Sequence, residues 1–498
     1  MLKNKLFHVA AAGVLTLAAA GNAVAALTPF QQDVATAINN GLAYLTTNGV
    51  FNNPSSLGVN GASGIAVEAL LEKRPSGNPA DPPQGYTGAI AADQALLRSA
   101  AEYMLTATST ATYYAYRDGS WMFALSGYAL TGGPDKSVLA PANAAVKTIK
   151  QTMDALVDRT LANQTAPGYW CYTAANCFDS STTQYAVAGL NAARVFYQSV
   201  KSGDAPYADG VRSGLIDAAL AKARNVYVIN AATGGDNAGC NVLTATERGH
   251  GYHPKNEGYN PSLQQTASGI YIQLFGGADV NTPNVQAYME WLRNRYRYTD
   301  LDSLGNSWPT LSYGYYLWSS FKAMELIRQS GVVVGVGNIG PNDLGTLPAG
   351  NAPACVVRES NKDPAVITRP ALFGVGGAGI YAAETKGQYF DYAHQLIAMQ
   401  CANGAFTCTG YPGSWEGGVN ASHNGYALLV LQRATGVIIS RCDVDGNGII
   451  NRADINAIRL GIGQSPGAND VRDANVDGKI TIVDVRLCTQ QCTNTSCN

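Results

Sequence analysis

Near the C-terminus, two stretches place oxygen-bearing side chains at the same positions of a twelve-residue loop. The first runs from Asp443 to Asp454 and the second from Asp473 to Asp484. The side chains of the first are Asp443, Asp445, Asn447, Asn451 and Asp454, and those of the second are Asp473, Asn475, Asp477, Thr481 and Asp484. Glycine at the sixth position allows a sharp turn, and the seventh residue, Ile449 or Lys479, offers a backbone carbonyl. This spacing wraps oxygen ligands around one point, so the sequence predicts two bound Ca²⁺ ions.

Apolar residues Ile455, Ile458 and Ile462 follow the first loop at helical spacing. The two loop-helix units, at about residues 442–488, resemble a type I dockerin. The resemblance implies a small module that folds with calcium and binds a cohesin domain on another protein. The helix after the second loop departs from that pattern, because Cys488, Cys492 and Cys497 soon interrupt it.

The N-terminal residues 1–25 have the pattern of a secretory signal peptide. Lys3 and Lys5 precede an apolar run from Val9 to Ala20. Ala23-Val24-Ala25 then provides a small-residue cleavage site. The run is too short for a stable membrane span. We therefore expect a secreted protein, extracellular or at the cell surface, that does not insert into the membrane after cleavage.

Ten cysteines agree with an oxidising compartment. Their spacing suggests local disulfides, although sequence alone does not fix connectivity. The suggested pairs are Cys171–Cys177, Cys401–Cys408, Cys442–Cys488, Cys492–Cys497 and, by remainder, Cys240–Cys355. The pair Cys492–Cys497 lies in a short tail, residues 489–498.

The chain carries a net charge of −2 and only 14% charged residues. No basic run stands out, so nucleic acid is not an expected partner. The 27 tyrosines and the many neutral polar residues suit neutral ligands such as polysaccharides.

Residues 26–438 contain a degenerate repeat that predicts an all-α domain. We read Gly-x-Trp stretches, as at 119–121 and 168–170, as turns that precede helices rich in small residues. Such helices are expected from Ser180, Ser262, Ser422 and Gly61, with more amphipathic helices between them. The amphipathic helices are expected at Ala91–Leu105, Ala145–Leu161, Val285–Tyr296 and Tyr389–Met399. Stacked helix pairs of this kind close into an α/α toroid, with small-residue helices inside.

The same pattern resembles the repeats of the terpenoid cyclase and protein prenyltransferase superfamily, which implies the toroid fold. The Asp-x-Asp-Asp motif of the cyclases is absent, with 300–303 as the nearest approach, so terpene cyclisation is not expected. Residues 330–375, rich in Gly, Pro, Asn and Val, are expected to form an inserted loop, either a lid or a plain surface insertion.

The segment from residue 236 to 259 gathers acids, bases and tyrosines just before the helix expected at Ser262. The candidate catalytic residues are Asp236, Glu247, His250, His253 and Glu257. A carboxylate pair suits glycoside hydrolysis, a histidine suits proton abstraction by a lyase, and the histidines with Glu247 suit a metal. A hydrogen-bonded loop that orders the rim is the structural alternative. Asp118 and Asp179 are read as helix caps, and the repeat tryptophans as packing residues.

Two functions remain open from the sequence. In the first, the protein is exported, the calcium module mediates attachment or assembly, and the toroid is a binding or scaffold body. In the second, the toroid is the catalytic domain of a glycoside hydrolase or polysaccharide lyase. The absence of a complete catalytic signature favours the first.

Overall fold

Helices are the main regular secondary structure in the part of the chain that is described, which confirms the all-α prediction. The computed structural model describes residues 26–52, 64–79, 81, 83–108, 111–198, 207–232, 243–255, 260–299, 311–330, 332–353, 356–408, 411–412, 419–434, 442, 444, 450–466, 470–474 and 479–490. Within these ranges the only β-structure is two isolated bridges, Trp170 to Asp179 and Ala232 to Gly249.

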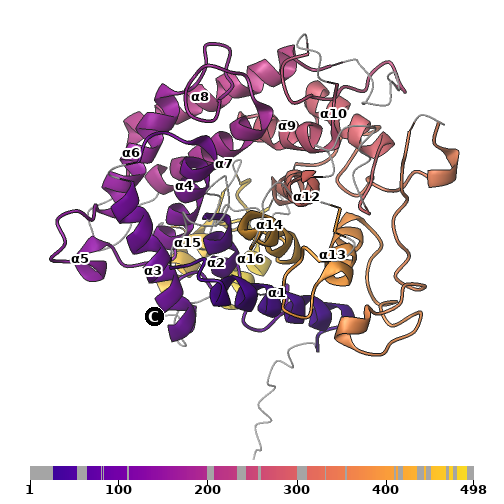
Figure 1. Cartoon of the computed structure of the whole chain (residues 1–498), viewed down its shortest axis with the longest axis horizontal. Helices are drawn as coiled ribbons and strands as arrows, with labels where there is room; N and C mark the ends of the chain where they lie inside the picture. The colour runs from indigo at the N-terminus through magenta and orange to yellow at the C-terminus, as the bar shows by residue number, and fades with distance from the viewer. Residues whose placement is uncertain are drawn as a thin grey trace, which may run out of the picture.

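Six helices contact one another in a closed ring. They are α2 (Gly64–Leu71), α4 (Ala115–Leu130), α7 (Ser180–Gln198), α9 (Leu263–Phe275), α12 (Tyr313–Ser330) and α14 (Ala421–Leu431). Each packs against the next in this order, and α14 packs against α2 (Figure 1). At the closing contact, Gln432 Nε2 donates to the carbonyl oxygen of Ala69 at 2.8 Å. Every residue of α2 and α14 is buried, as expected of helices that are covered on all sides.

Small residues let neighbouring helices of the ring approach closely. A side chain on Gly119 of α4 would clash with the carbonyl oxygen of Tyr185 in α7, and a Cβ on Gly189 of α7 would lie 2.5 Å from the carbonyl oxygen of Gly119. Both positions therefore require glycine, even though glycine is a poor helix former. The alternation of small residues with Leu and aromatic residues thus sets the distance between α4 and α7.

Six further helices lie around the outside of the ring (Figure 1). They are α1 (Pro29–Thr47), α3 (Ala91–Ala107), α6 (Ile149–Ala162), α8 (Gly210–Ile229), α10 (Pro283–Asn294) and α13 (Gln388–Met399), and a short helix α5 (Lys136–Leu139) follows α4. Capping boxes at Thr28 and Thr148 satisfy backbone donors at the starts of α1 and α6. Helices α6 and α10 each bury one face, in agreement with the amphipathic helices that the sequence predicts there. Helix α13 differs, because nine of its twelve residues are buried.

Most helix boundaries follow the sequence closely. Helix α7 begins at Ser180 as predicted, and Ser262 caps α9 by accepting from the backbone nitrogen of Gln265 at 3.4 Å. The prediction of a turn at Gly119–Trp121 was wrong, because these residues lie inside α4. Trp121 and Trp170 are both buried, in agreement with a packing role. The pattern has two further predicted turns, at 306–308 and 413–415, whose tryptophans Trp308 and Trp415 lie outside the described residues.

In its described part, the segment 332–387 between α12 and α13 contains only two short 3₁₀ helices, η1 (Ala349–Asn351) and η2 (Ala371–Phe373). This segment contacts the outer helices α10 and α1. The backbone nitrogen of Ile339 donates to Gln286 of α10 at 2.7 Å, and Arg369 donates to Asp33 of α1 at 2.8 Å. These contacts favour the plain surface insertion over a lid.

The apolar core is divided into two separate clusters. One contains the core residues of the helices α1 to α14, and the other is formed by residues of 442–488. Disulfides Cys171–Cys177, Cys401–Cys408 and Cys442–Cys488 are present as the spacing suggested. The remaining four cysteines, Cys240, Cys355, Cys492 and Cys497, lie outside the described residues. None of the helices in the described ranges is both long and apolar enough to cross a membrane.

Candidate functional site

The two C-terminal units repeat one arrangement at the start of each helix. Helix α15 (Arg452–Gly461) follows the first loop and contacts α16 (Ile482–Gln490), which follows the second. The twelfth loop residue, Asp454, accepts from the backbone nitrogen of Asn451 at 3.0 Å and from that of Val444 at 2.7 Å. Its counterpart Asp484 accepts from the backbone nitrogen of Thr481 at 2.7 Å. Each carboxylate therefore ties the ninth loop position to its helix.

Three of the predicted calcium ligands are buried carboxylates. Asp454, Asp473 and Asp484 are only 1%, 5% and 0% exposed. Burial of a carboxylate costs free energy unless hydrogen bonds or a cation compensate it. A hard cation such as Ca²⁺ prefers carboxylate, amide and carbonyl oxygens, which are the groups that both loops supply. The donor chemistry and burial of the described residues thus fit calcium.

A small apolar core lies beside these carboxylates. Ile450 and Ile480, the eighth residues of the two loops, are buried together with Ile458 of α15 and Val485 of α16. The Cys442–Cys488 disulfide joins the two ends of this region. The matching loop positions therefore have matching environments in the two units.

The other predicted ligands divide between described and undescribed positions. Asn451 and Thr481 start α15 and α16, and Lys479 is exposed. The predicted ligands outside the described residues are Asp443, Asp445, Asn447, Ile449, Asn475 and Asp477. Within the described ranges no three His, Cys, Asp or Glu side chains lie close enough together to hold a metal.

In the 236–259 segment, Glu247 has structural partners. Its carboxylate is fully buried and accepts from Asn294 Nδ2 at 2.5 Å, from the guanidinium of Arg295 at 3.0 Å and from the backbone nitrogen of Leu243 at 2.6 Å. These bonds connect the segment to the end of α10. Asp236 and Glu257, the partners expected for acid/base chemistry, lie outside the described residues.

His250 is directed to a different part of the molecule. Its Nδ1 lies 2.7 Å from the carbonyl oxygen of Gly251 and its Nε2 lies 2.8 Å from the hydroxyl of Tyr169, while the ring stacks on Tyr227 at 4.2 Å. Burial lowers the pKa of His250 to about 4, so the imidazole is neutral at pH 7. A neutral ring that donates to Gly251 from Nδ1 accepts from Tyr169 at Nε2. Both nitrogens are thus engaged within the protein.

His253 lies two residues beyond Gly251 and is half-buried, with its ring at the edge of Tyr252 at a centroid distance of 4.8 Å. Its predicted partners Glu247 and His250 make the separate contacts described above. The described residues of the segment therefore fit a hydrogen-bonded loop that orders the rim. They do not bring Glu247, His250 and His253 together as an active site would.

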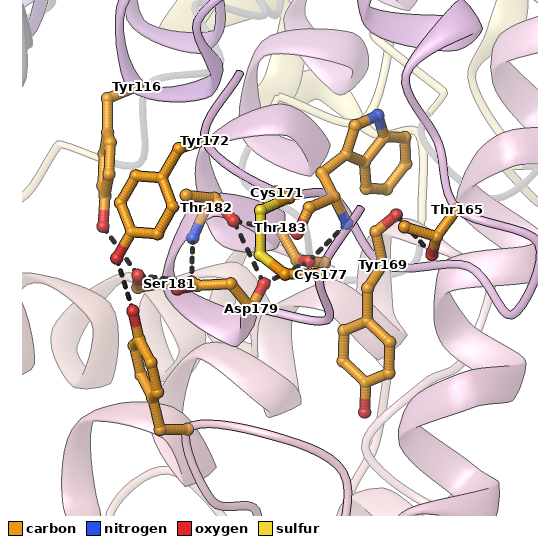
Figure 2. Close-up of a disulfide and its surroundings, with 12 residues drawn as sticks. Tyr116, Thr165, Tyr169, Cys171, Tyr172, Cys177, Asp179, Ser181, Thr182 and Thr183 are labelled. Atoms are coloured by element: carbon orange, nitrogen blue, oxygen red, sulfur yellow. Dashed lines mark hydrogen bonds between the residues drawn. A yellow bond between two sulfur atoms is a disulfide. The ribbon is translucent and has the colours of Figure 1, made fainter. Parts of the chain in front are cut away.

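A more compact polar cluster surrounds Asp179 at the start of α7 (Figure 2). Asp179 is buried, and its Oδ1 accepts from the backbone nitrogen of Thr182 at 2.9 Å and from the hydroxyl of Ser181 at 2.6 Å. The first bond is the helix cap that the sequence predicts. The hydroxyl of Tyr116 lies 2.6 Å from Ser181 Oγ, and the hydroxyl of Tyr172 is hydrogen-bonded to that of Tyr252.

The Cys171–Cys177 disulfide closes the turn that carries Tyr172 and leads to Asp179 (Figure 2). Residues on both sides of the disulfide meet, since the backbone nitrogen of Asp179 donates to the carbonyl oxygen of Trp170 at 3.3 Å. The cluster thus draws on the start of α4, this closed turn, α7 and the 250–252 loop. Sequence analysis missed the cluster because its members are far apart in the chain.

Asp118 offers a contrast at the equivalent end of α4. Its two carboxylate oxygens accept from Arg159 Nε at 2.6 Å and from Arg159 Nη2 at 2.7 Å, and Arg117 donates to it at 2.9 Å. Two guanidinium groups therefore neutralise Asp118. This bonding explains the residue as a structural ion pair between α4 and α6.

Comparison of the sequence with known protein families and with curated proteins finds no match.

Proposed function

We propose that the protein binds two calcium ions through residues 442–488 and uses this module to attach to a partner protein. In this proposal the closed ring of helices is an α/α toroid that serves as the binding or scaffold body. The observation that carries the proposal is the matched environment of Asp454 and Asp484 in the two loop-helix units. Two calcium ions would supply positive charge to the buried carboxylates and stabilise the loops.

Exposed apolar side chains at the end of α15 and the start of α16 support a protein partner. The backbone nitrogen of Gly463, after α15, donates to the carbonyl oxygen of Ile480, before α16, at 2.9 Å. Apolar side chains on these adjoining segments are exposed, with Leu460 at 82% and Ile482 at 52%. Exposed apolar side chains are typical of the centre of a protein interface. We take the partner to be a cohesin-like domain, as the dockerin resemblance implies.

Calorimetric titration of the full-length protein with Ca²⁺ tests the metal sites. We expect two sites in the wild type and one in each of Asp454→Ala and Asp484→Ala. The control is Asp470→Asn, which alters a carboxylate of the same module that pairs with Arg472 and is no predicted ligand. Absence of calcium-dependent heat in the wild type would exclude the proposal.

The partner is tested separately, with immobilised cohesin domains of several types and the full-length protein in Ca²⁺ or in chelator. We expect calcium-dependent retention that Leu460→Asp weakens at least about tenfold. Calcium binding without retention on any cohesin would keep the metal sites and reject the cohesin-like partner.

A further inference from the structure

A cavity lies beside the contact that closes the ring. It is bordered by three helices that contact one another, α1, α13 and α14, and by the turn after α2 (Figure 1). Gln432, which bonds to Ala69 at the closing contact, forms part of its wall. We propose that this cavity binds a small carboxylate that carries a short apolar group, with the guanidinium of Arg74 as its partner. The inference goes beyond calcium-dependent attachment, because it assigns a ligand to the ring of helices.

The walls of the cavity are mostly apolar. Phe30, Val34 and Ile38 contribute from one face of α1, and Leu431 contributes from the end of α14. Tyr389 of α13 also lines the cavity, and its hydroxyl donates to the carbonyl oxygen of Leu431 at 2.9 Å. The polar end of this tyrosine is therefore already bonded. An apolar group of a ligand would gain free energy by leaving water for these walls.

Arg74 supplies the positive charge in the wall. Its Nε donates to the carbonyl oxygen of Asp81 at 2.7 Å. Its Nη1 donates to the carbonyl oxygen of Gln432 at 2.6 Å and to that of Glu72 at 3.4 Å. These bonds fix the plane of the guanidinium, while Nη2 makes no hydrogen bond to a described residue. Arg74 is only half-buried, so the two N–H groups of Nη2 are available to a ligand from solvent.

The charge of Arg74 is not cancelled by an ion pair with any carboxylate in the described ranges. Glu72 lies near enough to respond to Arg74, but burial raises the pKa of Glu72 by more than the charge of Arg74 lowers it. A second guanidinium, that of Arg433, lies 3.8 Å from the centroid of the Tyr389 ring and also has no ion pair with a described acid. Two unpaired cations beside one cavity favour an anion.

The size and the one-sided charge of the cavity narrow the class of anion. Its volume of about 30 Å³ is that of about two water molecules, so a sugar ring is too large. Phosphate and sulfate carry oxygens on every side and need donors all round. The cavity offers a free donor from Arg74 and apolar groups elsewhere. A carboxylate with carbon at its other end matches this division.

The backbone at Arg433 gives an independent indication. Arg433 follows the end of α14 with a φ of 57°, in the left-handed region that favours glycine. Its backbone nitrogen donates to the carbonyl oxygen of Val430 at 3.0 Å, and that of Ala434 donates to Leu429 at 2.9 Å. Glycine would form this turn at lower cost. The turn itself does not account for the arginine, whereas a positive charge beside the cavity does.

The experiment titrates the full-length protein with small acids, followed by ligand-observed NMR. Chelator is present, so that the calcium module does not contribute. The probes are butanoate, hexanoate and benzoate, each with its neutral amide, and inorganic phosphate. We expect at least one acid to bind saturably, and its amide and phosphate to bind at least about tenfold more weakly. Lack of saturable binding by every acid, or an amide or phosphate that binds as tightly as the acid, overturns the inference.

Two variants test the guanidinium groups. Arg74→Gln removes the charge in the wall and should weaken the best acid by about tenfold or more. Arg433→Gly removes the second charge at a position where glycine is favoured, so the fold should be kept while affinity falls by about threefold. The matched control is Arg194→Gln, because Arg194 already pairs with Asp217, and it should leave the affinity unchanged.

Thermal unfolding shows which of these variants fold. Arg433→Gly carries the test if Arg74→Gln unfolds, because its backbone position suits glycine. Wild-type affinity in the cavity variants that fold, or an equal loss of affinity in Arg194→Gln, overturns the inference.

Discussion

The guanidinium of Arg295 donates to Glu247 at 3.0 Å, and both side chains are almost completely buried. Breaking such a pair leaves a buried charge without its partner. We expect Glu247→Ala to lower the free energy of unfolding by about 3 kcal/mol or more, measured by chemical denaturation. The control is Asp217→Ala, because Asp217 pairs with Arg194 on the surface and should contribute less than about 1 kcal/mol. Equal small effects of the two changes would contradict a structural role for Glu247.

The contact between α4 and α7 gives a second prediction. Gly119→Ala introduces a methyl group against the backbone of Tyr185, which cannot move without shifting α7. We expect a loss of about 2 kcal/mol or more in the free energy of unfolding, as overpacked cores show. Gly214→Ala in α8 is the control, since its new methyl group meets no atom within 4 Å. That change should instead stabilise the helix by up to about 1 kcal/mol. A neutral Gly119→Ala would show that the two helices adjust freely.

A third prediction concerns acid stability. Burial lowers the pKa of His250 and His394 to about 4 and that of His423 to about 3, from an ordinary value of 6.5. As pH falls below 6.5, the unfolded chain binds protons that the folded chain does not, so stability decreases toward pH 4. His250→Gln should reduce this slope between pH 6 and 4.5 by about 1.4 kcal/mol per pH unit. Denaturation curves at several pH values provide the measurement, and an unchanged slope would indicate that His250 is protonated in the fold.

The Cys442–Cys488 disulfide gives a fourth prediction. It closes a loop with a sequence separation of 46, so it restricts the unfolded module strongly. Replacing both cysteines with serine should lower module stability by up to about 4 kcal/mol. We expect weaker calcium affinity in the same variant, because binding must then also order the module. Calcium titration of the variant and the wild type measures the difference, and equal affinities would show that the loops are ordered without the disulfide.

Helix positions could be predicted because the spacing of apolar residues and the helix-capping residues are local properties of the sequence. Ser180 and Ser262 mark the starts of α7 and α9, and both lie next to small-residue helices. The turn predicted at Gly119 was wrong because close packing outweighs the low helix propensity of glycine at that position.

The candidate site was harder to predict, because nearby residues in the chain can serve different parts of the fold. Glu247 contacts the end of α10, whereas His250 contacts Tyr169 and Tyr227. No local pattern distinguishes these directions. The same reason hid the Asp179 cluster, which the fold assembles from distant segments.

The bond between Gln432 and Ala69 also limits when the protein can fold. It joins residues separated by 363 positions. Helix α14 must therefore be synthesised before it can pack against α2. Until then α2, which is buried on every side in the finished ring, lacks the surface of α14 that covers it. Long-range contacts of this kind form slowly, because the chain between them must first be brought together. In a nascent chain that ends before α14, the apolar side of α2 that α14 covers therefore stays uncovered. The ring can close only after translation has passed residue 432.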